Sequence, residues 1–258
     1  MRLDKFLADM SIGTRKELKA KIRSGAVQVN GTPIRDPGFA VTGDEEVTYA
    51  GKPVAYHHYE YYMMNKPAGV ITATEDRRKE TVLDLMKDVA NYVPTSEQEV
   101  FLMRKDLSPV GRLDRDTVGL LLITNDGALN HRLLSPKKHV DKQYFARVKG
   151  KNGVVTESDV QAFADGLPVD EELTALPAKL EITGTDENSA ESETLVTIRE
   201  GKFHQIKRMF AARDQEVIYL KRLSMGPLTL DPDLPEGKFR KLTDEELAAL
   251  MTASDSEG

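Results

Sequence analysis

The stretch GRLDRDTVGLLLITNDG, residues 111–127, constrains the fold of this chain most strongly. Residues 118–124 are an apolar run bounded by turn signals, and this pattern predicts a short buried strand. Two arginines and two aspartates lie in residues 112–116, directly before that run. If this lead-in is extended, Arg112, Asp114 and Asp116 share one face. The sequence therefore predicts a buried strand that begins at a charged loop.

Length and composition describe an ordinary globular protein and exclude several kinds of site. The 258 residues suit one large domain or two modest ones. The chain has no cysteine, so disulfides, thiolate zinc sites and a cysteine nucleophile are excluded. No apolar run is long enough to span a membrane, and the N-terminus lacks the apolar core of a signal peptide. We therefore expect a cytoplasmic protein with no membrane partner, and we expect a monomer.

No cofactor or metal is expected either. The five histidines form no H-x-x-x-H pair and show no ligand spacing to a carboxylate cluster. The glycine-rich motifs that hold nucleotide phosphates are absent, and so is G-x-S-x-G. The remaining possibility is a site built from aspartate, tyrosine and basic side chains.

The charge is unevenly distributed along the chain. The net charge is -6, yet residues 1–35 hold eight Lys/Arg against three Asp/Glu. Residues 104–149 hold ten against five, and residues 201–222 hold six against two. Basic regions in an acidic background are typical of a protein that binds a phosphate backbone, and the net charge conceals them. This distribution favours a nucleic-acid partner over solvated basic surfaces on different sides.

The hydrophobic pattern predicts a small N-terminal domain over residues 1–50. Two helices are expected, over 2–10 and 15–25, with Thr14 as the N-cap of the second and Gly25 at its end. Asn30-Gly31 predicts a tight turn between two short strands. A linker over 51–60 leads to a catalytic domain over 61–235, and a C-terminal helix and tail follow over 236–258.

The larger domain is predicted to be α+β, with a mixed or antiparallel sheet. Strands are expected on both sides of a turn at 65–69 and over 118–124, 142–150, 178–184 and 193–201. Helices are expected over 81–86, 128–136, 158–167, 204–217 and 243–251. Thr243 is placed to cap the last helix, with Glu246 in the capping-box position.

The two aspartates of the charged loop leave the chemistry open. A pair of carboxylates about 5–9.5 Å apart is the arrangement of glycoside hydrolases. Asp–Arg pairs on a surface loop would be of little energetic consequence. The spacing alone distinguishes neither aspartate from the other. A shortage of aromatic residues for sugar stacking, with no tryptophan, disfavours a glycosidase.

Five stretches of this chain resemble the pseudouridine synthases of the RsuA branch, in that family's order. GRLDRDTVGLLLITNDG resembles the central motif, MNKPAGVITAT (64–74) the first motif, HVDKQYFARV (139–148) the tyrosine motif and EGKFHQIKRMFAA (200–212) the third motif. Residues 2–31 resemble the αL RNA-binding module, which ribosomal and tRNA-synthetase proteins share. The resemblance also extends through the closing segment 226–246. It predicts an αL domain followed by a pseudouridine synthase domain.

The resemblance implies a reaction and the residues that perform it. A uridine in RNA becomes pseudouridine without cofactor or metal: the glycosidic bond breaks, the uracil rotates, and C5 bonds to the ribose. Asp114 holds the place of the family's nucleophile, and Tyr144 that of the tyrosine stacked on the flipped base. Lys207 holds the place of the basic residue beside the aspartate, where many relatives outside this branch carry arginine. The resemblance leaves Asp116 a structural role, in bracing the charged loop.

The same resemblance assigns RNA contacts and a substrate. Arg112 is placed to fill the gap left by the flipped base or to hold phosphate. The αL module is expected to bind by shape and phosphate contacts. The expected RNA-binding residues are Arg2, Arg15, Lys16, Lys19, Arg23, Lys66, Arg112 and Arg208. The predicted substrate is 16S, small-subunit ribosomal RNA, free or in a pre-ribosomal particle. Large-subunit RNA, or a catalytically silent assembly factor, is the alternative.

Overall fold

The computed structural model describes residues 1–10, 12–43, 45–54, 59–96, 101, 103–135 and 140–255. The backbone forms two compact units. The first contains residues 1–60 and 96–107, and the second contains residues 61–95 and 108–258. The chain therefore leaves the second unit once, after residue 95, and returns to it at residue 108, before the charged loop. The domain boundaries expected from the sequence remain a prediction.

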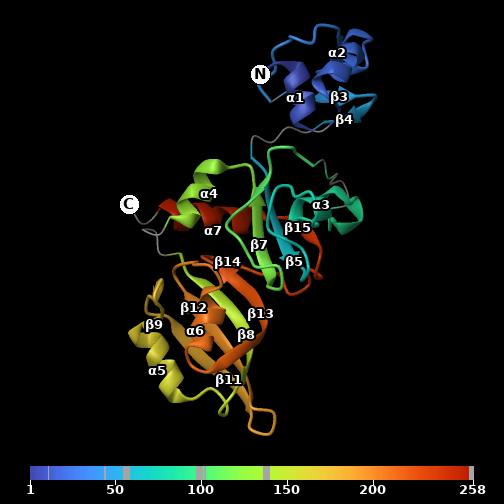
Figure 1. Cartoon of the computed structure of the whole chain (residues 1–258). Coiled ribbons are helices and arrows are strands. Elements are labelled where there is room, and N and C mark those ends of the chain that lie inside the picture. The colour runs from blue at the N-terminus through green and yellow to red at the C-terminus, as the bar shows by residue number, and fades with distance from the viewer. Residues whose placement is uncertain are drawn as a thin grey trace. The chain divides into compact units, whose positions relative to one another are not determined.

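The first unit packs two helices on a small antiparallel sheet (Figure 1). The sheet has the order β2-β1-β3-β4, and its elements are α1 (Leu3–Asp9), α2 (Arg15–Arg23), β1 (Val27–Val29), β2 (Thr32–Ile34), β3 (Val47–Tyr49) and β4 (Lys52–Pro53). Thr14 caps α2, as the sequence predicts, and Glu17 completes a reciprocal capping box with it. Asn30 and Gly31 both have positive φ, as the tight turn between β1 and β2 requires. The core is formed by apolar side chains at helical and alternating spacing, among them Leu3, Phe6, Leu18, Ile22, Val27 and Val47.

The second unit is built on a nine-stranded mixed sheet (Figure 1). Seven strands lie in the order β11-β12-β8-β13-β7-β5-β15, while β14 pairs with β13 and β6 with β7. Their bounds are β5 (Tyr61–Lys66), β6 (Ser108–Pro109), β7 (Val118–Thr124), β8 (Lys142–Gly150), β11 (Lys179–Asp186), β12 (Glu191–Ile198), β13 (Gln215–Met225), β14 (Leu228–Thr229) and β15 (Phe239–Lys241). A separate pair joins β9 (Leu167–Asp170) and β10 (Leu173–Ala175). The mixed sheet confirms the predicted fold class.

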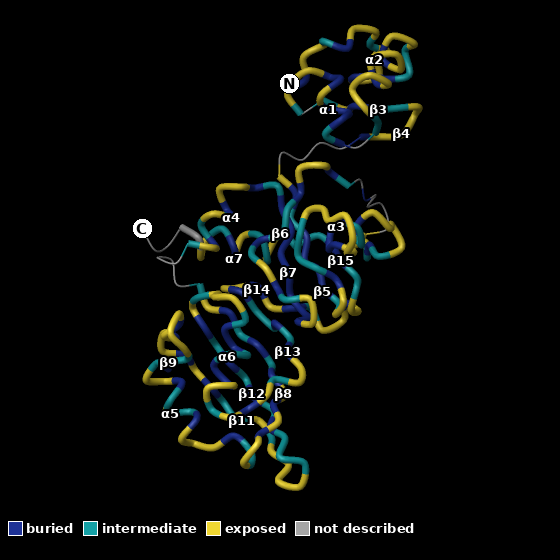
Figure 2. The backbone as a smooth tube through the Cα atoms, in the orientation of Figure 1, coloured by how far each residue is buried: buried dark blue, intermediate teal, exposed yellow. Residues whose placement is uncertain are grey.

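The buried strand predicted at residues 118–124 is β7, and all its residues are buried (Figure 2). It pairs antiparallel with β5 and parallel with β13. Gly119 makes the parallel pairing possible. Its φ is +100°, and a Cβ there would lie 2.3 Å from the carbonyl oxygen of Arg222. Only glycine lets the two backbones approach this closely.

Helices flank this sheet at several places. The second unit contains α3 (Val82–Lys87), the 3₁₀ turn η1 (Val89–Asn91), α4 (Gly127–Leu134), α5 (Glu157–Asp165), α6 (Gln205–Ala211) and α7 (Asp244–Asp255). In the second unit, α5 packs against strand β11 and α6 packs against strand β13, while α4 contacts α7. Gly166 ends α5 with a positive φ. Thr243 and Glu246 exchange hydrogen bonds at the start of α7, as predicted.

Two expected elements differ from the structure. The helix predicted over 204–217 ends at Ala211, because Asp214 has a positive φ and residues from Gln215 onward pair with β8. The strand expected after the turn at 65–69 is reduced to an isolated bridge between Ile71 and Thr81. At the end of α6, pairing with a distant strand overrides the local helical pattern. Within the described residues, no helix is long and apolar enough to cross a membrane.

Candidate active site

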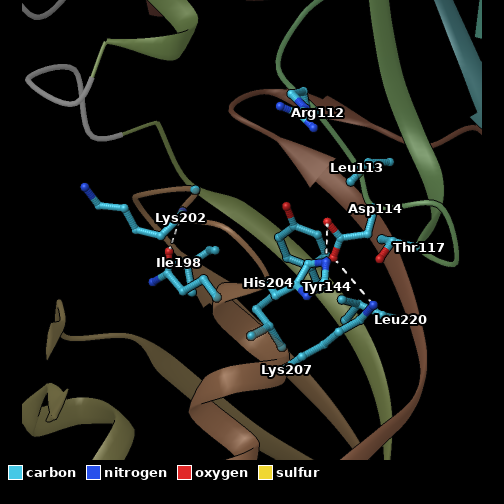
Figure 3. Close-up of a pocket in the computed structure, with 13 residues that line it drawn as sticks. Arg112, Leu113, Asp114, Thr117, Tyr144, Ile198, Lys202, His204, Lys207 and Leu220 are labelled. Carbon is cyan, nitrogen blue, oxygen red and sulfur yellow. Dashed lines mark hydrogen bonds and ion pairs between the residues drawn. The ribbon is translucent and has the colours of Figure 1, made fainter. Parts of the chain in front are cut away.

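A pocket in the second unit brings together the central, tyrosine and third motifs (Figure 3). Its lining includes Arg112, Asp114, Tyr144, His204 and Lys207. These residues come from the charged loop before β7, from β8 and from the start of α6. Segments about 30 to 90 residues apart in sequence therefore converge on one carboxylate.

The first motif holds the charged loop in place rather than lining the pocket. Lys66, at the end of β5, is completely buried. Its ammonium donates to the carbonyl oxygens of Pro67, Asp114 and Thr117, at 3.0, 3.1 and 2.9 Å. Thr72 donates to the carbonyl of Leu113 and accepts from its N–H. The backbone beside Asp114 is thus fixed from both sides.

Gly69 and Arg115 complete this bracing. The Gly69 N–H donates to the carbonyl of Arg115 at 2.8 Å, and the Arg115 guanidinium donates back to the carbonyl of Gly69 at 2.8 Å. The Arg115 side chain therefore turns to the first motif. A site residue held by backbone hydrogen bonds is pre-organised for chemistry.

The burial of Lys66 overturns its expected RNA contact. An ammonium with no exposed surface cannot reach a phosphate. Burial lowers the pKa of Lys66 to about 8, against the opposing effect of the Asp116 and Asp114 carboxylates. The turn expected at 65–69 suggested a surface position, but Lys66 ends β5 and its ammonium points to the loop carbonyls.

The two aspartates differ in their surroundings. Asp114 lines the pocket with 28% of its side chain exposed, whereas Asp116 is 73% exposed and lies outside the lining. Lys207 contacts both: its Nζ lies 2.6 Å from Oδ1 of Asp116 and 3.5 Å from Oδ2 of Asp114. The hydrogen bond from Lys207 lowers the pKa of Asp116. Asp116 therefore holds the lysine, and Asp114 faces the pocket.

Tyr144 forms one wall of the pocket from the middle of the sheet. On β8 it pairs with Val196 of β12 and Arg222 of β13, and only 7% of it is exposed. Strand alternation points Tyr144 to the same side as Ala146 and Val148. In Figure 3 the Asp114 carboxylate is turned toward the ring of Tyr144, with Arg112 at the pocket's edge. A base in the pocket would find a ring face beside a carboxylate.

His204 is a pocket residue to which the sequence assigned no role beyond excluding a metal. It precedes α6 in the left-handed conformation, with φ 49° and ψ 30°. Its Nε2 lies 3.5 Å from Oδ1 of Asp114, whereas Lys207 contacts the other carboxylate oxygen, Oδ2. The signal was present in the sequence, since His204 lies three residues before Lys207 inside the third motif.

The remaining expected RNA contacts have different surroundings. Arg112 is exposed at the pocket, whereas Arg208 is ion-paired with Asp170 of β9.

In the first unit Arg2 and Arg15 both pair with the buried carboxylate of Asp4, and of the two arginines Arg2 lowers the pKa of Asp4 most. Both arginines stay about half exposed. Four other exposed cations of α2 make no ion pair within the described residues: Lys16, Lys19, Lys21 and Arg23.

The fold and the site together define an RNA-modifying class of enzyme: a small unit with an exposed basic helix precedes a mixed sheet with an aspartate pocket. The model of the RNA pseudouridylate synthase family matches residues 60–212, and the model of the S4 domain matches residues 1–47. The chain belongs to the RNA pseudouridylate synthase family, whose members are isomerases, and carries an N-terminal S4 domain.

Relatives match along almost the whole chain. An uncharacterised RNA pseudouridine synthase of Bacillus subtilis is 47% identical, over 97% of this chain and 98% of its own length. The ribosomal small subunit pseudouridine synthase A of Vibrio cholerae is 40% identical, over 97% and 99%. Its Escherichia coli counterpart is 35% identical, over 97% and 100%. A crystal structure of a pseudouridylate synthase superposes with a TM-score of 0.62 at 33% identity, covering 97% of this chain and 99% of that one.

Proposed function

We propose that this enzyme converts one uridine of small-subunit ribosomal RNA to pseudouridine, with Asp114 as the nucleophile. The observation that carries the nucleophile assignment is the placement of Asp114: it faces a pocket that Tyr144 and Lys207 also line, while Asp116 lies outside it. The assignment of the RNA rests on relatives from Vibrio cholerae and Escherichia coli that are named ribosomal small subunit pseudouridine synthase A.

The proposed reaction is an isomerisation that needs no second substrate. The Asp114 carboxylate attacks, and the bond between N1 of uracil and C1′ of ribose breaks. The detached uracil rotates on the face of Tyr144, and its C5 bonds to C1′. C5 then loses its proton and N1 gains one, so the atoms balance. Whether Asp114 adds to C1′ of the ribose or to C6 of the uracil, its bond to the nucleotide breaks again once C5 is joined to C1′, and the free carboxylate is regenerated.

The residues around Asp114 support these roles. Lys207, held by Asp116, places its positive charge 3.5 Å from one oxygen of Asp114 and stabilises negative charge there. His204 flanks the other oxygen. Tyr144 offers a face on which a base gains about 1–3 kcal/mol by stacking. The uridine must leave its own stack to enter, and Arg112 at the pocket edge is available to its phosphate.

The first unit is proposed to deliver the RNA. The exposed cations of α2 support binding to a phosphate backbone by an affinity that falls with salt. We propose that the protein acts as a monomer in the cytoplasm. The substrate is the small-subunit RNA, either free or within a pre-ribosomal particle.

The test is to incubate the enzyme with unmodified small-subunit and large-subunit RNA, each free and as an assembly particle, and to map pseudouridine. Small-subunit RNA is expected to gain one pseudouridine, and Asp114→Asn to bind that RNA and form none. Asp116→Asn is the matched control, expected to keep reduced turnover. Full turnover by Asp114→Asn would refute the nucleophile assignment. Loss of turnover in a folded Asp116→Asn protein alone would exchange the two roles.

A further inference from the structure

An exposed phenylalanine lies directly beside the pocket. Phe203 has 71% of its surface exposed, although it is large and apolar. Single exposed apolar side chains are common and need no explanation by themselves. Phe203 differs because the next residue, His204, lines the pocket and contacts Asp114.

The two rings form a stack that ends at the catalytic carboxylate. The ring centroids of Phe203 and His204 are 3.8 Å apart, and the ring planes differ by 17°. The left-handed backbone of His204 is uncommon for a residue other than glycine. It persists because the surrounding contacts require it. With one face on His204 and most of its surface in solvent, Phe203 has room for another ring.

The segment carrying this stack is braced from the helix behind it. Arg208 of α6 donates to the carbonyl oxygen of Phe203 at 3.2 Å, and Asp170 of β9 holds the Arg208 guanidinium. Gln205 accepts from the N–H of Lys202 at 3.0 Å and donates to Glu200 at 2.7 Å. The exposed ring is therefore presented from a fixed backbone. Such a surface binds a flat partner without first having to be ordered.

Cations that line the pocket indicate the kind of partner. Lys202 and Arg112 both line the pocket, both are exposed, and neither makes an ion pair within the described part of the chain. An open aromatic face next to a pocket that unpaired cations line suits a nucleotide, whose base stacks while its phosphate meets a cation. An RNA chain that enters the pocket with one nucleotide must also pass its neighbours over this edge.

We propose that Phe203 stacks on the nucleobase next to the target uridine in the RNA chain. The enzyme then holds two nucleotides, the uridine against Tyr144 and its neighbour against Phe203. This proposal rests on the proposed function, because the neighbour is defined by the uridine in the pocket. Stacking accepts every base, so Phe203 contributes to affinity and to alignment of the uridine, and base choice comes from elsewhere.

The experiment uses the full chain and short RNAs that contain the modified uridine, with 2-aminopurine placed one nucleotide before or after it. Stacking on an aromatic ring quenches this fluorescent base, so binding and stacking are read together. The variants are Phe203→Ala, Phe203→Leu and Phe203→Trp. Val89→Ala is the matched control, since Val89 is 62% exposed and does not line the pocket.

The expected result separates stacking from size. Phe203→Trp keeps the quenching and a Kd within about twofold of the parent. Phe203→Leu and Phe203→Ala lose the quenching at one of the two positions, and their Kd weakens by about five- to hundredfold. Their loss in kcat/KM arises mainly from KM. Val89→Ala behaves like the parent protein.

Two results would overturn the proposal. Phe203→Leu could bind with unchanged Kd and quenching, which would show that the ring meets no base. Alternatively, it could lower kcat alone with quenching intact, which would show that Phe203 only positions His204. The quenching is measured on bound RNA whether or not pseudouridine forms. A protein that quenches but isomerises no RNA would refute the proposed function and leave the stacking site supported.

Discussion

Replacing Lys66 by methionine tests whether the first motif controls the catalytic loop. Methionine keeps the length of the side chain and removes the ammonium. Three carbonyl oxygens, those of Pro67, Asp114 and Thr117, then lose a charged donor. Because Lys66 is completely buried, water cannot replace that donor without opening the structure.

The size of the effect follows from two opposing contributions. Three hydrogen bonds from a charged group contribute about 4–9 kcal/mol together. Burial of the ammonium opposes them: the lowering of the Lys66 pKa from 10.5 to about 8 corresponds to about 3 kcal/mol. Lys66→Met should therefore lower the free energy of unfolding by about 1–6 kcal/mol. It should also lower kcat, because the backbone of Asp114 is no longer held.

Lys142 on β8 provides the matched control. It is also buried, and burial also lowers its pKa to about 8. Its ammonium, however, donates to one carbonyl, that of Val140 at 2.9 Å. One charged hydrogen bond roughly balances the cost of burial, so Lys142→Met should change stability by only about 1 kcal/mol in either direction. The difference between the two variants isolates the contribution of the loop carbonyls.

The pH dependence gives a second measurement. Both lysines have folded-state pKa values near 8, below the unfolded value of 10.5. Between these values the unfolded chain binds more protons, so stability rises with pH, by at most about 3 kcal/mol for each lysine. Turnover should fall over the same range, because neutral Lys66 makes weaker hydrogen bonds to the loop.

The assays are urea unfolding between pH 7 and 10 and single-turnover pseudouridine formation. Each single variant should remove part of the rise in stability, and Lys66→Met alone should also remove the fall in turnover near pH 8. If Lys66→Met unfolds like Lys142→Met and keeps the parental turnover, the loop is held by other contacts and the reasoning is refuted.

Two further predictions concern the sheet and the first unit. Gly119→Ala should destabilise the protein by about 3 kcal/mol or more, because a Cβ at φ +100° lies 2.3 Å from the backbone of β13. Gly127→Ala, with open space around it, is the control in urea unfolding. Equal stability of the two variants would refute the clash. The triple variant Lys16→Gln, Lys19→Gln, Arg23→Gln should make the slope of log affinity for RNA against log salt concentration shallower by up to about 2. An unchanged slope in a binding titration would contradict phosphate contacts by α2.

Much of the fold could be predicted because its signals are local. The buried strand at 118–124, the cap at Thr14 and the turn at Asn30 depend on residues within a few positions of one another. Gly166 ends α5 with a positive φ, a conformation that favours glycine, so this helix end also depends on a local residue choice. The helix expected to extend to residue 217 failed because its last residues pair with β8, far away in sequence.

The candidate site could be predicted only in part. The order of the motifs pointed to Asp114, Tyr144 and Lys207, and the structure places all three around one pocket. The sequence did not distinguish a lysine that meets RNA from one that is buried, so Lys66 was assigned wrongly. It assigned His204 no part in the site, because its nearness to Asp114 depends on how α6 packs against β13.

The sequence by itself determined the elements, their order and the family to which the chain belongs, since helix caps, tight turns and strand alternation act over short distances. The tertiary structure alone decided what surrounds Asp114. The ammonium of Lys66 lies 48 residues before it in the chain, and Lys207 lies 91 residues beyond the Asp116 that holds it. Electrostatic contacts act through space, so only the folded sheet separates the aspartate that faces the pocket from the one that braces it.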